Sequence, residues 1–293
     1  ILVLCRHSWF PLFTKSEARN FILPVRHLLR TRVLNGCTQW PEVAAAPMGY
    51  RPLRRLSIDT YAVPKRDVVE RQVRGGHYAV RMRFIAALYR FVIAFFCFAG
   101  TYEAWLSGIG NRWVFFTVQT NVLLGVVMLW AGAATLLKGI QPPAWIKGAL
   151  TLNIIVTGLV AWFVLPPSDP ATTAFAFGVM TTTMAHIIVP IMASVDFLVF
   201  DPHRRFPWHY TLSWLIYFPF YLAFVLIRAQ IWPHSGPGAS GNPYPYGFID
   251  LQALGWQRTA LNCVEYLGAF FVLALVLFLI DRILPKRTPL TVL

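Results

Sequence analysis

The sequence predicts an all-α fold, a polytopic membrane protein built as a six-helix transmembrane bundle. The chain of 293 residues is 57% hydrophobic and 13% charged, whereas an ordinary soluble domain is roughly 25% charged. It also contains six apolar stretches that each approach about 20 residues, the length a helix needs to cross about 30 Å of hydrocarbon. No single globular core of this size needs so many consecutive apolar helices of spanning length.

The first three predicted spans cover residues 84–105, 113–137 and 145–165. The first lacks a small-residue cleavage site and is too long for the apolar core of a signal peptide, so we expect it to be retained. Arg90 lies near its cytoplasmic end, where the long side chain is expected to reach water. The second begins with the polar residues considered below.

The last three predicted spans cover residues 177–200, 212–231 and 261–284. Pro190 frees the carbonyl of His186 from its helical hydrogen bond, which predicts a kink in the fourth span. The longest loop covers residues 232–256, and its Pro and Gly content forbids a regular helix. Its aromatic side chains suit the membrane interface, where the loop either caps an outward-facing cavity or forms an interfacial belt.

The distribution of basic residues predicts the orientation. Residues 1–81 hold 14 of the 26 Lys and Arg but five of the 12 Asp and Glu, so nine of the net +14 charges precede the first span. The predicted inner loops and tail also carry seven basic residues against two in the outer loops. The positive-inside rule accounts for this pattern without a nucleic-acid partner. We expect a multi-pass protein of the plasma (inner) membrane with both termini cytoplasmic.

The chain is predicted to consist of two parts, residues 1–81 and 82–293. The first is a basic segment with scattered Arg, several Pro and no sustained helical period, typical of a poorly ordered tail. Alternatively, residues 21–29 form an amphipathic patch on an anionic inner leaflet. A further hypothesis is that the segment is not native sequence, because Met82 directly precedes the first span and would serve as a start.

The four cysteines form no CxxC pair and no regular spacing, so neither a zinc site nor a disulfide framework is predicted. We expect no metal and no cofactor. Several buried histidines would be needed for a haem-bearing bundle, and only His186 lies deep in a predicted span.

Three polar residues share one face of the second span. Thr117, Thr120 and Asn121 stand at i, i+3 and i+4 of a helix, while Gln119 points away. Polar side chains are costly in hydrocarbon and often mark function there. The alternative is structural, with the threonines bonded to carbonyls of the preceding turn and the asparagine joining two helices.

The fourth span offers the one histidine well inside a predicted helix. Thr182, His186 and Pro190 lie along one stripe, beside the predicted kink. Alternatively His186 is a neutral structural donor to a neighbouring helix. From the predicted span boundaries, Thr117 and His186 differ in depth by roughly 7 Å, and by less if the fourth helix starts later or tilts.

The sixth span carries Arg258, Asn262 and Glu265 at i, i+4 and i+7. This spacing predicts a structural pair in which Arg258 shields Glu265 across two turns. The alternative is that Glu265 lines a cavity and supports binding.

Four motifs together resemble the bacterial Pr6Pr-type membrane proteins. They are residues 115–121, residues 186–190 followed by Asp196, residues 214–221 with Pro219, and residues 244–250. These proteins are similar in turn to the androgen-induced membrane-protein family of animals. That resemblance implies hydrolysis of fatty-acid esters of hydroxy fatty acids, with Thr117 as nucleophile and His186 as its partner. The interval from His186 to Pro190 is one residue shorter than in the animal pattern.

The first functional hypothesis is therefore an intramembrane lipid-ester hydrolase. A neutral imidazole within about 3 Å can take the proton of a threonine hydroxyl. The oxyanion then needs donors or support from polar residues, for which the candidates are Thr120, Asn121, Asn153, Thr182 and Glu265. The expected partners are membrane lipids, including the lipid-ester substrate; the acyl chain and the oligomeric state stay open.

The second hypothesis is a non-enzymatic transporter or lipid-binding membrane protein. His186, Asp196 and Glu265 would then line a polar path. No internal repeat or pair of broken helices of the kind many transporters show is apparent in the sequence.

Overall fold

The computed structural model describes residues 66–106, 110–171 and 173–287. The chain divides into two units, Ile1–Ala62 and Val63–Leu293, and every described residue belongs to the second. Six of its helices are long and apolar enough to cross a membrane, which confirms the all-α, six-span prediction. Residues 1–65 of the segment predicted to be poorly ordered lie outside the described residues. The rest of that segment, residues 66–81, is helical.

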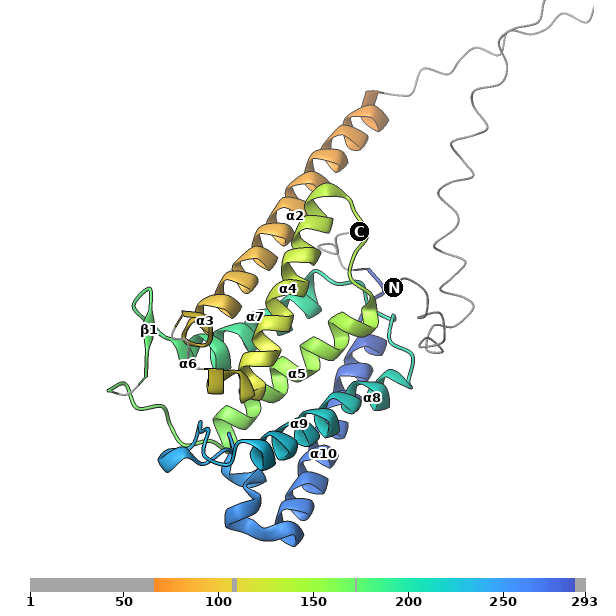
Figure 1. Ribbon diagram of the computed structural model, residues 1–293. Coiled ribbons are helices and arrows are strands. Elements are labelled where there is room, and N and C mark those ends of the chain that lie inside the picture. The colour runs from red at the N-terminus through yellow and green to blue at the C-terminus, as the bar shows by residue number, and fades with distance from the viewer. Residues whose placement is uncertain (1–65, 107–109, 172, 288–293) are drawn as a thin grey trace, which may run out of the picture. The chain divides into compact units, whose positions relative to one another are not determined.

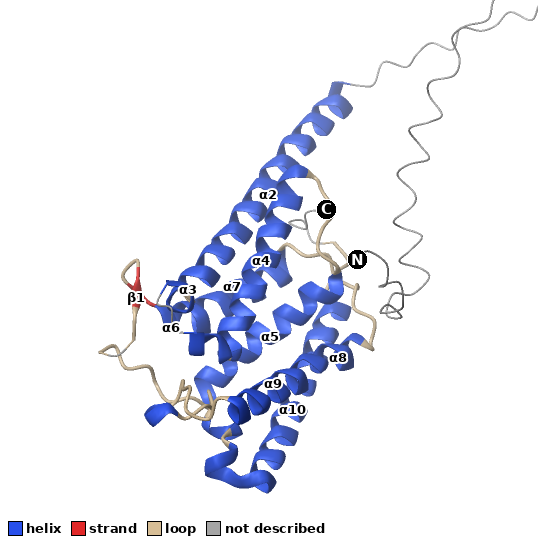
Figure 2. Cartoon of the chain, viewed as in Figure 1, coloured by secondary structure: helices blue, strands red, loops and turns tan. Residues whose placement is uncertain are grey.

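The described residues are mainly helical, with loops and one short hairpin between the helices (Figures 1 and 2). In chain order the elements are α2 (Arg66–Ala99), α3 (Tyr102–Leu106), η1 (Gly110–Val114), α4 (Phe116–Leu137), α5 (Ala144–Phe163), β1 (Phe175–Ala176), β2 (Val179–Met180), α6 (Thr181–Thr183), η2 (Met184–Ile188), α7 (Val189–Val199), α8 (Tyr210–Ser213), η3 (Trp214–Ile216), α9 (Tyr217–Ile231), η4 (Ala239–Gly241), η5 (Gly247–Ile249) and α10 (Leu251–Ile283).

Helices α2, α4, α5 and α7 pack against one another in a four-helix arrangement. Their facing side chains form one apolar core of fully or almost fully buried residues: Ile93, Ala94, Cys97, Leu124, Val127, Met128, Leu150, Ile154, Val189 and Ala193. Association of helices in lipid depends on close packing, because lipid tails are as apolar as the side chains. This core therefore packs α4, which carries Thr117, with α7, which directly follows the turn that carries His186.

Helices α9 and α10 pack on the other side of α5, around a second apolar core. Its centre combines Leu152 and Val156 of α5 with Val225 of α9 and Leu277 of α10. Phe116 at the start of α4 and Tyr246 from the long loop belong to the same cluster. Because α5 contributes to both cores, it connects the α2–α7 bundle to the α9–α10 pair.

The last three spans each start at a different residue from the one predicted. The fourth begins at Thr181, because β1 and β2 form an antiparallel hairpin in which Phe177 and Gly178 have positive φ. The fifth begins with α8 and a 3-10 turn at η3; Pro219, just beyond, has no N–H for an α-helical bond. The sixth begins at Leu251, with a break at Gly255, where φ is 73°.

A buried ion cluster joins four of the spans near the C-terminal end of α4. The Arg90 guanidinium donates to Asp196 from Nε at 2.9 Å, to Asp201 from Nη2 at 2.9 Å and to the Thr135 hydroxyl from Nη1 at 2.6 Å. The Lys147 ammonium contacts both carboxylates. The prediction that Arg90 reaches water is wrong: it is 1% exposed, because the carboxylates from α7 and the segment after it satisfy its charge inside the bundle.

Candidate functional site

Thr117 and His186 lie in direct contact. The Oγ1 atom of Thr117, the second residue of α4, is 3.1 Å from Nε2 of His186. The span ends do not account for this contact, because both helices start later than predicted, at Phe116 and Thr181. Thr117 and His186 then stand one and five residues inside their helices, which still leaves a difference of about 6 Å along the helix axes. A hydroxyl and an imidazole from two different spans thus form a hydrogen-bonded pair.

The second ring nitrogen fixes the tautomer of His186. Nδ1 lies 3.0 Å from the carbonyl oxygen of Thr182, and a carbonyl oxygen can only accept a hydrogen bond. In the neutral ring Nδ1 therefore carries the proton, and Nε2 accepts from the Thr117 hydroxyl. This is the arrangement in which an imidazole acts as a general base toward a hydroxyl.

A π-helical turn presents the imidazole. Residues Met184–Ile188 form a π-helix, closed by a hydrogen bond from the N–H of Val189 to the carbonyl of Met184. Such turns inside α-helices occur frequently at functional sites, and this one stands directly before Pro190, where an α-helical bond is lost. A Cβ atom at Gly158 of α5 would lie 3.0 Å from the His186 carbonyl oxygen and 3.1 Å from Pro190. The glycine thus lets α5 approach the turn closely.

Two tyrosines satisfy the first N–H groups of α4. Phe115 at the N-cap position provides no side-chain cap. Instead the N–H of Phe116 donates to the Tyr221 hydroxyl at 3.2 Å, and that hydroxyl donates to the Val114 carbonyl at 2.8 Å. The N–H of Thr117 points to the Tyr246 hydroxyl at 3.5 Å. Partners from α9 and the long loop thus replace the missing cap.

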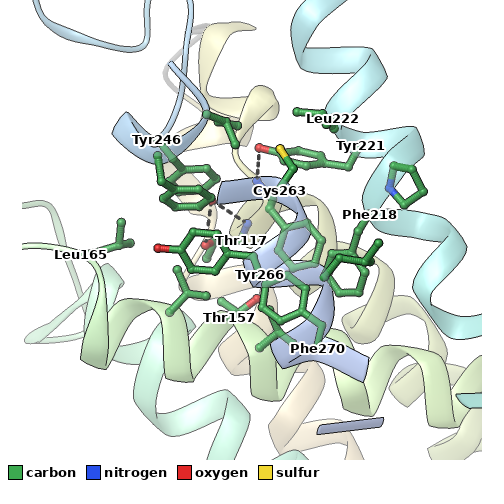
Figure 3. A pocket seen from close by; sticks show the side chains of 17 residues that line it. Thr117, Thr157, Leu165, Phe218, Tyr221, Leu222, Tyr246, Cys263, Tyr266 and Phe270 are labelled. Atoms are coloured by element: carbon green, nitrogen blue, oxygen red, sulfur yellow. Dashed lines mark hydrogen bonds between the residues drawn. The ribbon is translucent and has the colours of Figure 1, made fainter. Parts of the chain in front are cut away.

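Tyr246 also faces the pair formed by Thr117 and His186. Its hydroxyl is 3.5 Å from Oγ1 of Thr117 (Figure 3). Burial raises the pKa of Tyr246 above its ordinary value, so the phenol keeps its proton at neutral pH and stays a donor. The ring stacks on Phe248, with 5.3 Å between centroids, and meets Phe115 edge-on. These contacts fix the direction of the hydroxyl.

Hydrogen bonds hold the loop that carries Tyr246. Asp250 caps α10 by accepting from the N–H groups of Gln252 and Ala253, and also accepts from the Asn242 amide at 2.6 Å. The amide of Asn262 in α10 donates to the Phe248 carbonyl at 2.9 Å. Asp250 and Phe248 therefore each attach the segment from Asn242 to Asp250 to α10.

A mostly apolar cavity of about 150 Å³ opens beside Thr117 (Figure 3). Its lining comes from α4, α5, α9, α10 and the long loop: Phe116, Thr117, Val156, Thr157, Val160, Leu165, Phe218, Pro219, Tyr221, Leu222, Tyr246, Phe248, Ile249, Cys263, Tyr266, Leu267 and Phe270. Thr117 and Tyr246 bring neighbouring hydroxyls to a lining that is otherwise mostly aromatic and aliphatic. Pockets of this composition suit a ligand that is largely hydrocarbon.

The other residues expected from the sequence lie at different distances from this pair. Asn121 is fully buried, and its amide donates to the carbonyls of Thr117 and Ala185 at 2.9 and 3.3 Å, so it connects α4 to the turn of His186. Thr182 orients His186 through its carbonyl, and its buried hydroxyl has no partner among the described residues. Thr120 is fully buried in α4, and its hydroxyl also has no partner among the described residues.

Asn153 and Glu265 do not join the pair. Asn153 is buried in α5 one turn before Thr157, and its carbonyl accepts from the Thr157 hydroxyl at 3.0 Å. Glu265 is exposed on α10 and does not border the cavity. Among the ion pairs of the described residues, none connects Arg258 to Glu265.

Two functional candidates were missed by the sequence analysis, Tyr221 and Tyr246. Both lie within motifs of the family resemblance, residues 214–221 and 244–250, and that is the signal that could have identified them. Within the described ranges, no three His, Cys, Asp or Glu side chains gather as a metal site would require. The polar groups that come together at this site are the hydroxyls of Thr117 and Tyr246 and the imidazole of His186.

Comparison with known proteins adds no assignment to this geometry. No family model matches the chain, and neither a curated protein nor a solved structure matches it significantly. The sequence and the six apolar helices together establish a multi-pass α-helical membrane protein.

Proposed function

We propose that this protein is an intramembrane lipid-ester hydrolase with Thr117 as nucleophile and His186 as general base. The observation that carries the proposal is the 3.1 Å contact between Thr117 Oγ1 and His186 Nε2 at the edge of an apolar cavity. The nitrogen is the unprotonated one, since Nδ1 donates to the Thr182 carbonyl. A weak nucleophile becomes reactive when such a base takes its proton.

The reaction proceeds in two halves. Thr117 Oγ1 attacks the ester carbonyl carbon while its proton moves to Nε2 of His186. The tetrahedral intermediate collapses as the alcohol leaves with that proton, which gives an acyl-threonine. A water molecule, deprotonated by the same imidazole, then releases the fatty acid and restores the threonine.

Two features stabilise the negative charge that develops on the carbonyl oxygen. Tyr246 presents a protonated hydroxyl 3.5 Å from Oγ1, within reach of an oxyanion formed on the attached carbon. Thr117 is also the second residue of α4, and the partial positive charge at a helix N-terminus favours an anion there. Asn121 already donates to two carbonyls, so its role here is positional.

The cavity suits the acyl part of such a substrate. Phe218, Leu267 and Phe270 provide aromatic and aliphatic walls. A hydrocarbon chain bound in this chamber can bring its ester group to the hydroxyls of Thr117 and Tyr246. The resemblance of residues 115–121 and 186–190 to the Pr6Pr-type proteins, and through them to the animal hydrolases, supports the same assignment.

The test is hydrolysis of a branched fatty-acid ester of a hydroxy fatty acid by the reconstituted full chain. Thr117→Ala and His186→Ala should each abolish turnover, and Thr117→Ser should retain it, since the serine keeps a hydroxyl at the same place. Thr157→Ala is the matched control, because Thr157 lines the same cavity but bonds only to the Asn153 carbonyl. Turnover that survives in folded Thr117→Ala protein overturns the proposal.

A non-enzymatic lipid-binding protein is the second candidate, and the apolar cavity favours it. It predicts that wild type and Thr117→Ala bind a fatty ester equally and that neither releases product. The polar path proposed for a transporter finds less support: Asp196 is fully buried in the ion cluster and Glu265 is exposed outside the cavity.

A further inference from the structure

A second cavity, of about 250 Å³, lies at the other end of the bundle. Its lining is rich in basic side chains: Arg90, Gln141, Pro142, Lys147, Asp201, Pro202, His203, Arg205, Lys286 and Arg287. Thr135, which binds Arg90, stands 18 residues after Thr117 on α4. At 1.5 Å per residue, about 27 Å of helix separate this cavity from the proposed catalytic pair.

The inner wall of this basic cavity carries balanced charge. Arg90 and Lys147 are both buried, and each contacts both Asp196 and Asp201. Two cations and two carboxylates thus cancel, and Asp201 is the carboxylate that borders the cavity. The excess positive charge comes from the rim.

The rim brings together three cations from distant parts of the chain. Arg205 follows α7, and Lys286 and Arg287 follow α10; all three are exposed. No ion pair of the described residues involves any of them. Such a group of like charges repels itself, and an anion that joins it relieves the repulsion.

Backbone hydrogen bonds fix this rim. The N–H of His203 donates to the Lys286 carbonyl at 3.2 Å, and the N–H of Arg204 donates to the Asp281 carbonyl at 2.9 Å. The N–H of Arg205 donates to the buried carboxylate of Asp281 at 2.9 Å. The two segments that supply the cations are therefore fastened to each other independently of any charge on the rim.

We propose that this basic cavity binds a phosphate group, either that of an anionic membrane lipid or a dissolved phosphate anion. The rim cations follow the last residues of two spans, where lipid headgroups lie. Arg and Lys are the side chains that bind phosphate, through forked and point-charge contacts respectively. The site is separate from the proposed hydrolase centre and does not depend on it.

The experiment measures thermal unfolding of the full chain in neutral detergent at fixed ionic strength. Phosphatidylglycerol, diacylglycerol without phosphate, and inorganic phosphate are titrated separately. Stabilisation by phosphatidylglycerol alone identifies the lipid as the source, and stabilisation by inorganic phosphate identifies the dissolved anion. Stabilisation by neither, or an equal effect of diacylglycerol, overturns the proposal.

Two triple variants separate the site from general surface charge. Arg205→Gln/Lys286→Gln/Arg287→Gln removes the rim, and Lys138→Gln/Arg204→Gln/Arg282→Gln removes three exposed charges that do not line the cavity. The first should raise the apparent Kd for the phosphate ligand at least about tenfold, since each cation near an anionic surface contributes a factor of about five. The second should change it less than about threefold. Equal weakening in both variants would show that the binding is non-specific.

Discussion

Removal of the Asp196 carboxylate should destabilise the bundle more than removal of the other carboxylate of the ion cluster, that of Asp201. Asp196 is fully buried and accepts from Arg90 at 2.9 Å and from Lys147 at 2.6 Å. A hydrogen bond to a charged group contributes about 1.5–3 kcal/mol, so Asp196→Ala loses about 3–6 kcal/mol. The cost of breaking a buried ion pair by removing one partner, about 3–5 kcal/mol, agrees with that figure.

The assay is unfolding of the purified protein by sodium dodecyl sulfate in mixed micelles, followed by circular dichroism. Asp201→Ala is the comparison and should cost less, because the Asp201 side chain is 13% exposed and water can replace part of its contacts. Replacing all four charged residues by apolar ones of similar size should restore most of the loss. A cost below about 1 kcal/mol for Asp196→Ala would refute the reasoning.

Three further predictions concern the site and the elements that position it. Tyr246→Phe should lower kcat for the fatty ester about 100-fold, because it removes one oxyanion donor; an unchanged kcat would exclude that role. Gly158→Ala should destabilise the protein by about 1–3 kcal/mol and slow turnover, because its Cβ would press on the His186 carbonyl 3.0 Å away; full activity would show that the turn yields freely. Asp250→Ala should cost about 1–2 kcal/mol in the same unfolding assay, since it removes the cap of α10; an unchanged midpoint would contradict the capping assignment.

The six spans were predictable because hydrocarbon imposes one length and one polarity on every crossing helix. Their exact ends were not. Phe177 continues an apolar run, so hydropathy included it in the fourth span, whereas positive φ at Phe177 and Gly178 places it in a hairpin. Helix α4 also starts later than predicted, at Phe116, so the predicted span ends alone do not account for the contact between His186 and Thr117.

The candidate pair itself was identified from residue type, spacing and resemblance, but its surroundings were not. Tyr246 is 129 residues from Thr117 in sequence, and its loop has no periodicity from which a direction can be read. Arg90 was misjudged for a similar reason. Its partners Asp196 and Asp201 lie more than 100 residues away, and helix geometry alone does not identify long-range partners.

Covalent labelling of Thr117 is the sharpest test of the proposed nucleophile. The reconstituted full chain is treated with a fluorophosphonate, digested and analysed by mass spectrometry. We expect a phosphonate adduct on Thr117 that forms in wild type and in Thr157→Ala, and is absent from His186→Ala. An unlabelled Thr117 in folded wild-type protein, or equal labelling with and without His186, would contradict it.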